Sequence, residues 1–599
     1  MVYRRGRLIA VCFFVFLVTL RFYTHPRRSI YDVTEGKTSG PWNSKWNNPI
    51  KPPNASVTNG TTDEYATYLR SLTRKHGLTS EIPFFARRIQ PKYSSAAVKH
   101  RPSLTEVKTP FMKPPLGFTH AHIEDDALKL GQDVEKKPIA LPMGMAISAS
   151  RKPASIDASS LLFGVSSTYG RLVYADKALL HDCAAWLTDG RGASNGAGLV
   201  LSLHGASEAQ VAAIRKSLHQ LGVDVTVSAS AEGETDAGGR YAQLVQQMMR
   251  RRHLEPDRAY FALVDDDVFF PCLGRLLTHL RRFDPAGTYY IGVPSERADW
   301  VIDGNTAMTY GGGAVFLTAS MLDMAGQLLC LQYTKTGGQT NTVDDDQGKS
   351  WDVSLYECIA RHSPDTKLHV LPGLYTPSPR SGDTTTTTTI HGYSHGVTPL
   401  ALHRYRNYHR FEAGKGHAVT AACGEACFLQ RFLFRDDNWV LVNGYTITHY
   451  PDNLIAHKRQ QQHQHQSETE SSSKKKKKGY KNTAHPPGII TPSEKILIIN
   501  DGDYDHDHDR IFKKGKGKET ETYYSLAWQG RTKTFRLLDA VVRDDGEVWQ
   551  TYVNRKGGGN GNGNADDRFD DRQPGDIVHH EEGEEKSDLD SVILLVWVP

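Results

Sequence analysis

The feature of this 599-residue sequence that most limits its fold is a regular alternation of apolar and amphipathic runs between residues 161 and 264. Short apolar runs are typical of buried strands, and runs with apolar residues three and four apart are typical of helices. Strands that alternate with helices form a mostly parallel sheet covered by helices on both faces. The strand-like runs are 161–168, 198–205, 223–229 and 259–264, and the helix-like runs are 175–187, 209–222 and 240–252. We therefore expect an α/β domain with a Rossmann-like sheet.

The flanking segments differ in composition from this domain, which we place at residues 156–456. Residues 25–155 are rich in Pro, Ser, Thr and Lys, and we expect a flexible stem there. The segment 457–522 is a low-complexity insertion that has little apolar surface to bury. Residues 523–599 contain a further polar insertion and three strand-like runs, which predict a small antiparallel β appendage. These runs are 534–542, 547–553 and 591–598.

The N-terminus carries a targeting signal. The apolar run 8–20 follows Arg4, Arg5 and Arg7. Because no small-residue cleavage site follows, we interpret residues 1–24 as a cytosolic tail and an uncleaved signal-anchor transmembrane helix, with a cleaved signal peptide as the alternative. The expected location is the Golgi membrane, as a single-pass type II protein whose catalytic domain is lumenal. Sequons at Asn54 and Asn59 agree with a lumenal stem.

Net charge and cysteine content argue against a nucleic-acid-binding protein and against a zinc site. The formal net charge is only +5, and much of it lies in the run 474–478, so we expect no nucleic-acid partner. Of seven cysteines, Cys423 and Cys427 are spaced closely enough for a metal site, but a zinc site needs a second such pair and the sequence has none. The sequence gives no indication of the oligomeric state.

Three consecutive carboxylates, Asp265, Asp266 and Asp267, come directly after the strand-like run 259–264. Ligands of open α/β sheets bind beyond the carboxyl ends of the strands. Because residues two apart on an extended chain point the same way, Asp265 and Asp267 can share one hard cation. A cation there would bind a diphosphate and stabilise the charge that leaves with a nucleotide. The alternative is a solvated acidic turn or a helix N-cap.

A second candidate is the run Gly311, Gly312 and Gly313, which precedes an apolar segment. Glycine allows the backbone to approach a ligand closely. The alternative is an ordinary tight turn.

Several motifs taken together resemble a known family. The runs FALVDDDVFFPCLGRLLTHLRRFDPAGTYYIGVPSE, TYGGGAVFLTASML and WDVSLYECIARH are similar, in order and spacing, to the fringe-like and core-1 β1,3-galactosyltransferase group, glycosyltransferase family 31, and above all to its uncharacterised fungal branch. The resemblance covers roughly residues 160–455. It implies a GT-A fold, a UDP-sugar donor, Mn²⁺ as cofactor and inversion at the anomeric carbon.

The resemblance also implies roles for individual residues. Asp267 matches the best metal ligand, and Asp265 or Asp266 would serve the metal or the donor's sugar and ribose. The three glycines would line the donor and acceptor site. Asp352 matches the catalytic carboxylate, which acts as the base that an inverting transferase needs. The run 344–346 is the alternative for that role.

A histidine and two cysteine pairs complete the resemblance. His403 matches a C-terminal histidine that reaches back to the metal, and neutral imidazole is a reasonable ligand for Mn²⁺; His391, His395 and His409 are its rivals. Cys330 and Cys358 match a disulfide beside the catalytic loop, and Cys423 and Cys427 could pair locally. The pairing of Cys183 and Cys272 stays open.

The function that follows is an inverting, metal-dependent glycosyltransferase that moves a hexose or N-acetylhexosamine from a UDP-sugar to a glycan or glycoprotein hydroxyl, through a β1,3 linkage, in the secretory pathway. The alternative is a catalytically inactive lumenal protein on the same fold, with a carbohydrate-binding or chaperone-like role. A metal-dependent hydrolase of nucleotide sugars is a further alternative. The sequence does not identify the donor sugar or the acceptor.

Overall fold

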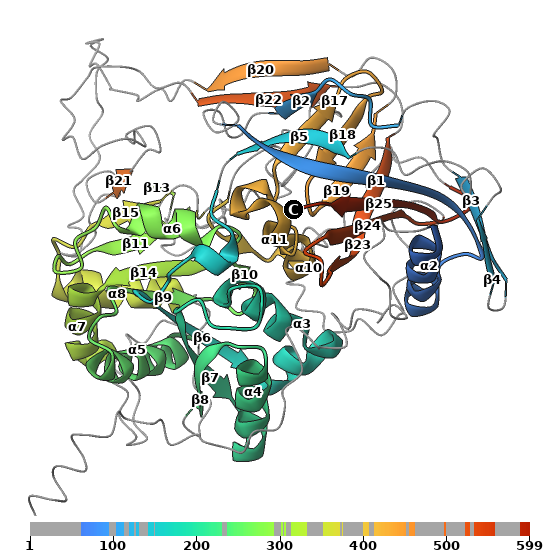
Figure 1. Ribbon diagram of the computed structural model, residues 1–599. Coiled ribbons are helices and arrows are strands. Elements are labelled where there is room, and N and C mark those ends of the chain that lie inside the picture. Colours follow the sequence, from blue (N-terminus) through green and yellow to red (C-terminus); the bar gives the residue numbers. More distant parts are fainter. Residues whose placement is uncertain are drawn as a thin grey trace, which may run out of the picture. The chain divides into compact units, whose positions relative to one another are not determined.

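The alternating runs form an eight-stranded sheet in the order β21-β15-β11-β14-β9-β6-β7-β8 in the computed structural model (Figure 1). Strand β6 pairs in parallel with β7 and β9, and β7 pairs in parallel with β8. These four strands lie where the sequence predicts them: β6 (Leu161–Thr168), β7 (Gly198–His204), β8 (Asp224–Ala229) and β9 (Tyr260–Val264). The expected mixed α/β, Rossmann-like arrangement is therefore present.

The other half of the sheet contains one strand of opposite direction. Strand β14 (Ala314–Thr318) pairs antiparallel with β9 and with β11 (Tyr290–Gly292). Strands β15 (Leu368–Val370) and β21 (Ile496–Ile498) extend the sheet in parallel with β11. Because β14 is antiparallel, its first residue lies opposite the last residue of β9, in the pair Ala314 and Val264.

The structure describes part of the chain, and all of that part belongs to the unit Asn47–Pro599. The described residues are 62–94, 104–112, 119–124, 127–130, 142–148, 150–230, 237–292, 301–302, 305–306, 313–331, 351–371, 374, 399–406, 412–450, 455–461, 496–498, 521–527, 532–556 and 587–599.

The helices agree with the sequence pattern except at their ends. Helix α3 (Tyr169–Leu187) begins directly after β6, because the side chain of Thr168 accepts a hydrogen bond from the Arg171 N–H and caps its first turn. Helix α4 (Glu208–Gln220) begins with a capping box in which Ser207 and Gln210 satisfy each other's backbone N–H. The remaining helices around the sheet are α5 (Ala237–Leu254), α6 (Leu273–Leu280), α7 (Ala319–Gln327) and α8 (Trp351–His362).

Each face of the sheet has its own hydrophobic core, because successive strand residues point to opposite faces. On β6, Leu162 packs in one cluster with residues of α5, α7 and α8, whereas Phe163 packs in another with residues of α3, α4 and α6. Figure 1 shows α5, α7 and α8 grouped on one side of this sheet. Helices therefore cover both faces, as expected for a doubly wound sheet.

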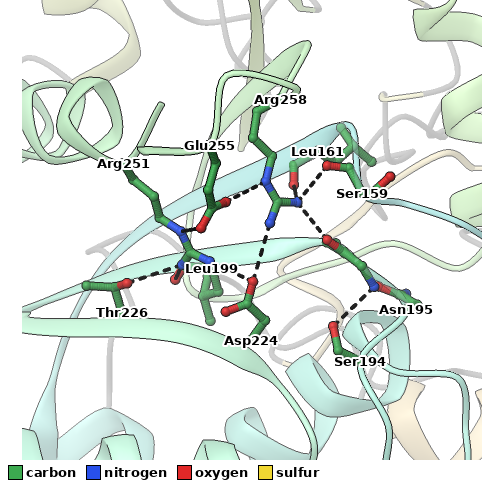
Figure 2. A network of polar contacts seen from close by, with 12 residues as sticks. Ser159, Leu161, Ser194, Asn195, Leu199, Asp224, Thr226, Arg251, Glu255 and Arg258 are labelled. Atoms are coloured by element: carbon green, nitrogen blue, oxygen red, sulfur yellow. Dashed lines mark hydrogen bonds and ion pairs between the residues drawn. The ribbon is translucent and has the colours of Figure 1, made fainter. Parts of the chain in front are cut away.

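Two buried arginines close the amino edge of the sheet (Figure 2). Arg258 Nη1 donates to the carbonyls of Ser159, Leu161 and Gly196 at 2.8, 2.7 and 2.6 Å. Arg251 Nη2 donates to Asp224 at 2.6 Å, and Glu255 contacts both arginines. The network satisfies the carbonyls where β6 begins, at the edge opposite the carboxyl ends of the strands.

A second sheet is larger than the small C-terminal appendage expected from the sequence. It has eleven strands, along the path β2-β17-β18-β19-β23-β24-β25-β1-β3-β4, with β5 paired to β1. The three C-terminal strands lie where predicted, as β23 (Lys533–Val542), β24 (Val548–Asn554) and β25 (Ser591–Trp597). The other strands are β1 (Glu81–Ser94), β2 (Leu104–Val107), β3 (Thr119–Glu124), β4 (Ala127–Leu130), β5 (Met143–Ser148), β17 (Arg431–Phe434), β18 (Trp439–Val442) and β19 (Thr446–His449).

Part of the expected flexible stem, residues 25–155, is therefore ordered. Strand β1 pairs in parallel with β25, with Phe84 opposite Val592 and Ile89 opposite Trp597. Helix α2 (Thr62–His76) buries Leu69 and Leu72 in a cluster with residues of β24 and β25. The polar composition of this segment suggested flexibility, but its apolar residues pack against strands from the far end of the chain.

Two further expectations fall largely outside the described residues. Of the expected insertion 457–522, only residues 457–461, 496–498 and 521–522 are described. The first and last of these lie in β20 (Ile455–Gln461) and β22 (Glu521–Ala527), which pair antiparallel. The signal-anchor predicted at residues 1–24 lies outside the described part; none of the helices within that part is both long enough and apolar enough to span a bilayer.

Candidate active site

Three distant segments meet at the carboxyl edge of the eight-stranded sheet. The Asp265–Asp267 turn follows β9 directly, and the Asp265 N–H donates to the Gly313 carbonyl at 2.9 Å. The next strand, β10 (Val268–Phe269), pairs antiparallel with β16 (Leu402–His403), so that Val268 lies opposite His403. Backbone pairing thus brings together residues that the sequence separates by more than a hundred positions.

The side chains of Asp265, Asp267 and His403 converge. His403 Nε2 lies 3.1 Å from Asp265 Oδ2 and 3.4 Å from Asp267 Oδ1. One ligand atom from each of the three residues lies within 4.8 Å of the others. The predicted choice of His403 is therefore consistent with the fold, whereas His391, His395 and His409 lie outside the described residues.

Burial makes this cluster electrostatically strained. Burial raises the pKa of Asp267 to about 6; the charges of Asp265 and Asp266 add to this rise, and His403 opposes it. For Asp265, burial alone would raise the pKa, but the hydrogen bond and charge of His403 and a hydrogen bond from Trp351 outweigh it and lower the pKa. A divalent cation between the two carboxylates would relieve their repulsion.

Gly313 leaves the space that His403 occupies. Its φ of +81° lies in the region that L-residues with a side chain rarely adopt. A Cβ at this position would lie 2.7 Å from Cγ of the His403 ring, which is closer than real Cβ contacts. The last of the three predicted glycines therefore has a definite role, and Gly311 and Gly312 lie outside the described residues.

Asp266 points to a different partner. Its carboxylate accepts hydrogen bonds from Arg171 Nε at 2.8 Å and Arg171 Nη2 at 2.7 Å, and also from the Ser167 hydroxyl. Both donors lie at the junction of β6 and α3, and no sequence motif marks either of them. Asp266 thus ties the Asp turn to the neighbouring strand, whereas its expected contact with the donor stays a prediction.

A buried carboxylate fixes the segment that follows His403. Asp182, on α3, accepts hydrogen bonds from the Tyr405 hydroxyl at 2.6 Å and from Arg406 Nε at 2.8 Å. The Gly414 N–H donates to its other oxygen at 3.0 Å. Four hydrogen bonds, two of them from Arg406, converge on this one side chain and hold the segment that carries the imidazole.

Asp352, the predicted base, lies in the first turn of α8 and is buried, at 6% exposure. The residue before it contacts the cluster directly, since Trp351 Nε1 donates to Asp265 Oδ1 at 2.6 Å. The start of α8 therefore lies at the site. The alternative base at 344–346 lies outside the described residues.

Two disulfides expected from the resemblance are present, Cys330–Cys358 and Cys423–Cys427. The first joins α8 to the residues after α7, and the second lies in the segment before β17. Among the cysteines that the structure describes, Cys183 and Cys272 form no disulfide.

The donor set fits a divalent metal. Two carboxylates suit Mg²⁺ or Mn²⁺, and an imidazole favours a transition metal such as Mn²⁺ over Mg²⁺. The second potential ligand group in the described part of the chain, Cys330, Cys358 and His362, includes both sulfurs of a disulfide and offers no thiolate. Asp265, Asp267 and His403 could therefore hold the metal.

No family model and no curated protein matches this chain, so the resemblance to the fringe-like group stays a prediction. Among solved structures, a glycosyltransferase involved in glycosylation of the major capsid of PBCV-1 is 12% identical, with 42% of this chain and 98% of that chain covered and a TM-score of 0.23.

Mouse xyloside xylosyltransferase 1 is 13% identical, with 35% and 84% of the two chains covered and a TM-score of 0.23. The inositol-1-phosphate CTP transferase from T. maritima is 14% identical, with 34% and 82% covered and a TM-score of 0.21. Similarities of this size do not decide a function, which has to be inferred from the geometry of the site.

Proposed function

We propose that this chain is an inverting, metal-dependent glycosyltransferase that moves a hexose or N-acetylhexosamine from a UDP-sugar to a hydroxyl of a glycan or glycoprotein. The observation that carries the proposal is the convergence of Asp265, Asp267 and His403 at the carboxyl edge of a doubly wound sheet. This edge is where open α/β sheets bind nucleotides. The resemblance of the motifs around these residues to the fringe-like group supports a β1,3 linkage, and the N-terminal apolar run 8–20 supports a lumenal catalytic domain and a Golgi membrane location.

Each residue then has a distinct task. Asp265, Asp267 and His403 would hold Mn²⁺, which when bound neutralises charge on the donor's diphosphate. Asp352 would take the proton of the acceptor hydroxyl as that oxygen bonds to the anomeric carbon and the bond from this carbon to the diphosphate oxygen breaks. Its support is its position in α8, one residue from the side chain that contacts Asp265.

A binding experiment separates these two roles. We expect Asp267→Asn to weaken binding of UDP in the presence of Mn²⁺, because the metal holds the diphosphate. We expect Asp352→Asn to keep that binding and to lower kcat by about 10²–10⁴-fold, the usual size of a general-base contribution. The measurement is calorimetric titration of UDP with Mn²⁺, followed by turnover with candidate UDP-sugars and product analysis.

Product analysis and a glycan titration test the alternatives. An inactive carbohydrate-binding protein would bind a glycan without Mn²⁺ or UDP, and a hydrolase would release free sugar whether or not an acceptor is present. Wild-type turnover of Asp267→Asn in excess EDTA would refute the metal-dependent mechanism. An equal loss of UDP affinity in both variants would place the base elsewhere, with the residues at 344–346 as the next to examine.

A further inference from the structure

The two carboxylate oxygens of Asp265 face different partners. Oδ2 faces the cluster, 3.1 Å from His403 Nε2. Oδ1 contacts an aromatic pair: it accepts a hydrogen bond from Trp351 Nε1 at 2.6 Å, and the Tyr241 hydroxyl lies 3.3 Å from it. A carboxylate can accept several hydrogen bonds, so a donor on Oδ1 leaves Oδ2 available as a ligand.

The aromatic pair is itself rigidly held. The rings of Trp351 and Tyr241 are stacked, with centroids 4.0 Å apart and planes 6° from parallel. Both side chains are buried, at 6% and 4% exposure. The Tyr241 hydroxyl donates to the Val264 carbonyl at 2.8 Å, which ties the pair to the last residue of β9. The indole N–H therefore has a fixed direction relative to the strand that carries Asp265.

A donor of this kind controls the geometry of a metal ligand. A carboxylate on a turn can rotate about its side-chain bonds, and a hydrogen bond to one oxygen selects a single orientation. Trp351 is also the first residue of α8, and Asp352 follows it directly. The hydrogen bond from Trp351 Nε1 therefore joins the expected metal ligand to the helix that carries the expected base.

We propose that Trp351 is a positioning residue: its indole N–H orients Asp265 for metal binding and couples occupancy of the metal site to the position of the first turn of α8. The proposal rests on the proposed function, because it concerns the same metal. It goes further because it couples two features of the site, metal binding and the order of the start of α8. By linkage, a metal that needs an oriented Asp265 stabilises the start of α8, and an ordered start of α8 strengthens metal binding.

The test replaces Trp351 by phenylalanine, which keeps a ring to stack on Tyr241 and removes the N–H. The probe is Mn²⁺ alone, titrated without nucleotide and followed by the paramagnetic resonance signal of the free ion. We expect Trp351→Phe to weaken Mn²⁺ binding by about 10-fold, the lower end of the range for partners of metal ligands. In EDTA, the unfolding midpoint of Trp351→Phe should stay close to that of the wild-type protein.

A matched control is available in the second sheet. Trp549 is also buried, at 1% exposure, and its Nε1 donates to a carboxylate, Glu547 Oε2, at 3.0 Å. Trp549→Phe removes an equivalent hydrogen bond, and it should leave Mn²⁺ affinity unchanged. If the role of Trp351 were merely structural, Trp351→Phe and Trp549→Phe would have the same effect on Mn²⁺ affinity.

A second measurement needs no variant. In the wild-type protein, Mg²⁺ or Mn²⁺ should slow amide hydrogen exchange in the first turns of α8, because the metal stabilises the orientation of Asp265 that Trp351 contacts. This decides the question even if Trp351→Phe does not fold. The N–H can also be removed without loss of shape by placing 3-benzothienylalanine at position 351.

The outcomes separate this proposal from the proposed function. Wild-type Mn²⁺ affinity in Trp351→Phe, or no change in exchange of α8 on metal addition, would overturn the positioning role and leave the transferase intact. A wild-type protein that binds no Mn²⁺ would overturn both. Weaker Mn²⁺ binding in Trp351→Phe, together with unchanged binding in Trp549→Phe, supports the coupling.

Discussion

Replacing Gly313 by alanine should damage the candidate metal site through a single steric contact. The added Cβ would lie 2.7 Å from Cγ, 2.8 Å from Cδ2 and 2.9 Å from Nδ1 of the His403 ring. Ordinary contacts begin at about 3.4 Å, so the ring must retreat by about 0.7 Å. Metal–ligand distances tolerate only about 0.2 Å. The imidazole would therefore lose its place as a ligand.

Two terms contribute to the loss of stability. A side chain at a φ of +81° costs roughly 1–2 kcal/mol. Overpacking against a ring that is only 7% exposed adds about 1–3 kcal/mol. We expect Gly313→Ala to lower the free energy of unfolding by about 2–5 kcal/mol in EDTA, and to weaken Mn²⁺ binding by at least about tenfold. Urea denaturation and titration with Mn²⁺ measure these two quantities.

Gly192 provides the matched control. Its φ is +88°, and a Cβ there would meet nothing within 4 Å. Gly192→Ala should therefore cost only the backbone term, about 1–2 kcal/mol, and leave Mn²⁺ affinity unchanged. In a His403→Ala background, Gly313→Ala should likewise cost only the backbone term, since the contact is gone. Wild-type Mn²⁺ affinity in Gly313→Ala, or an equal loss in Gly192→Ala, would refute the steric explanation.

Two other predictions concern stability. Burial raises the pKa of Glu425 to about 7 and lowers that of His417 to about 4. Because of Glu425, the free energy of unfolding should fall by up to about 3 kcal/mol as pH rises from about 4.5 to about 7. Because of His417, it should fall by up to about 3 kcal/mol as pH decreases from about 6.5 to about 4. The free energy of unfolding relative to wild type should therefore rise with pH for Glu425→Gln and fall with pH for His417→Gln. Urea denaturation across this pH range measures both differences, and slopes of the same sign would contradict the prediction. Arg258→Lys should lower the free energy of unfolding by about 2–4 kcal/mol, because it loses the contacts of the amino-edge network, without changing Mn²⁺ affinity. Arg435→Lys, at an exposed ion pair, should change stability by less than about 1 kcal/mol; equal losses in the two lysine variants would show that the network does not stabilise the fold.

The sequence by itself determined the α/β domain. The strand residues of β6 to β9 are apolar runs bounded by loops, and the helices between them repeat apolar residues at helical spacing. Both signals are local, so a single sequence is enough to read them. The candidate site could also be located from local sequence, because Asp265 and Asp267 directly follow an apolar strand.

Pairing between distant segments was decided only by the tertiary structure. Strand β1 joins β25, and no local pattern in the Pro- and Lys-rich N-terminal region reveals a partner some five hundred residues away. For this reason the sequence suggested a flexible stem and a small appendage where the fold has an eleven-stranded sheet.

The same limit applies within the site. His403 could be proposed only by resemblance, because its place beside Asp265 depends on the pairing of β10 with β16. The contacts of the Trp351 indole and the Arg171 guanidinium with the Asp turn could not be predicted from the sequence, since a tryptophan or an arginine beside a helix start is ordinary. Local sequence specifies which residues form strands and where carboxylates follow them; which side chain orients each carboxylate is a property of the packed fold, because those contacts join segments that meet only there.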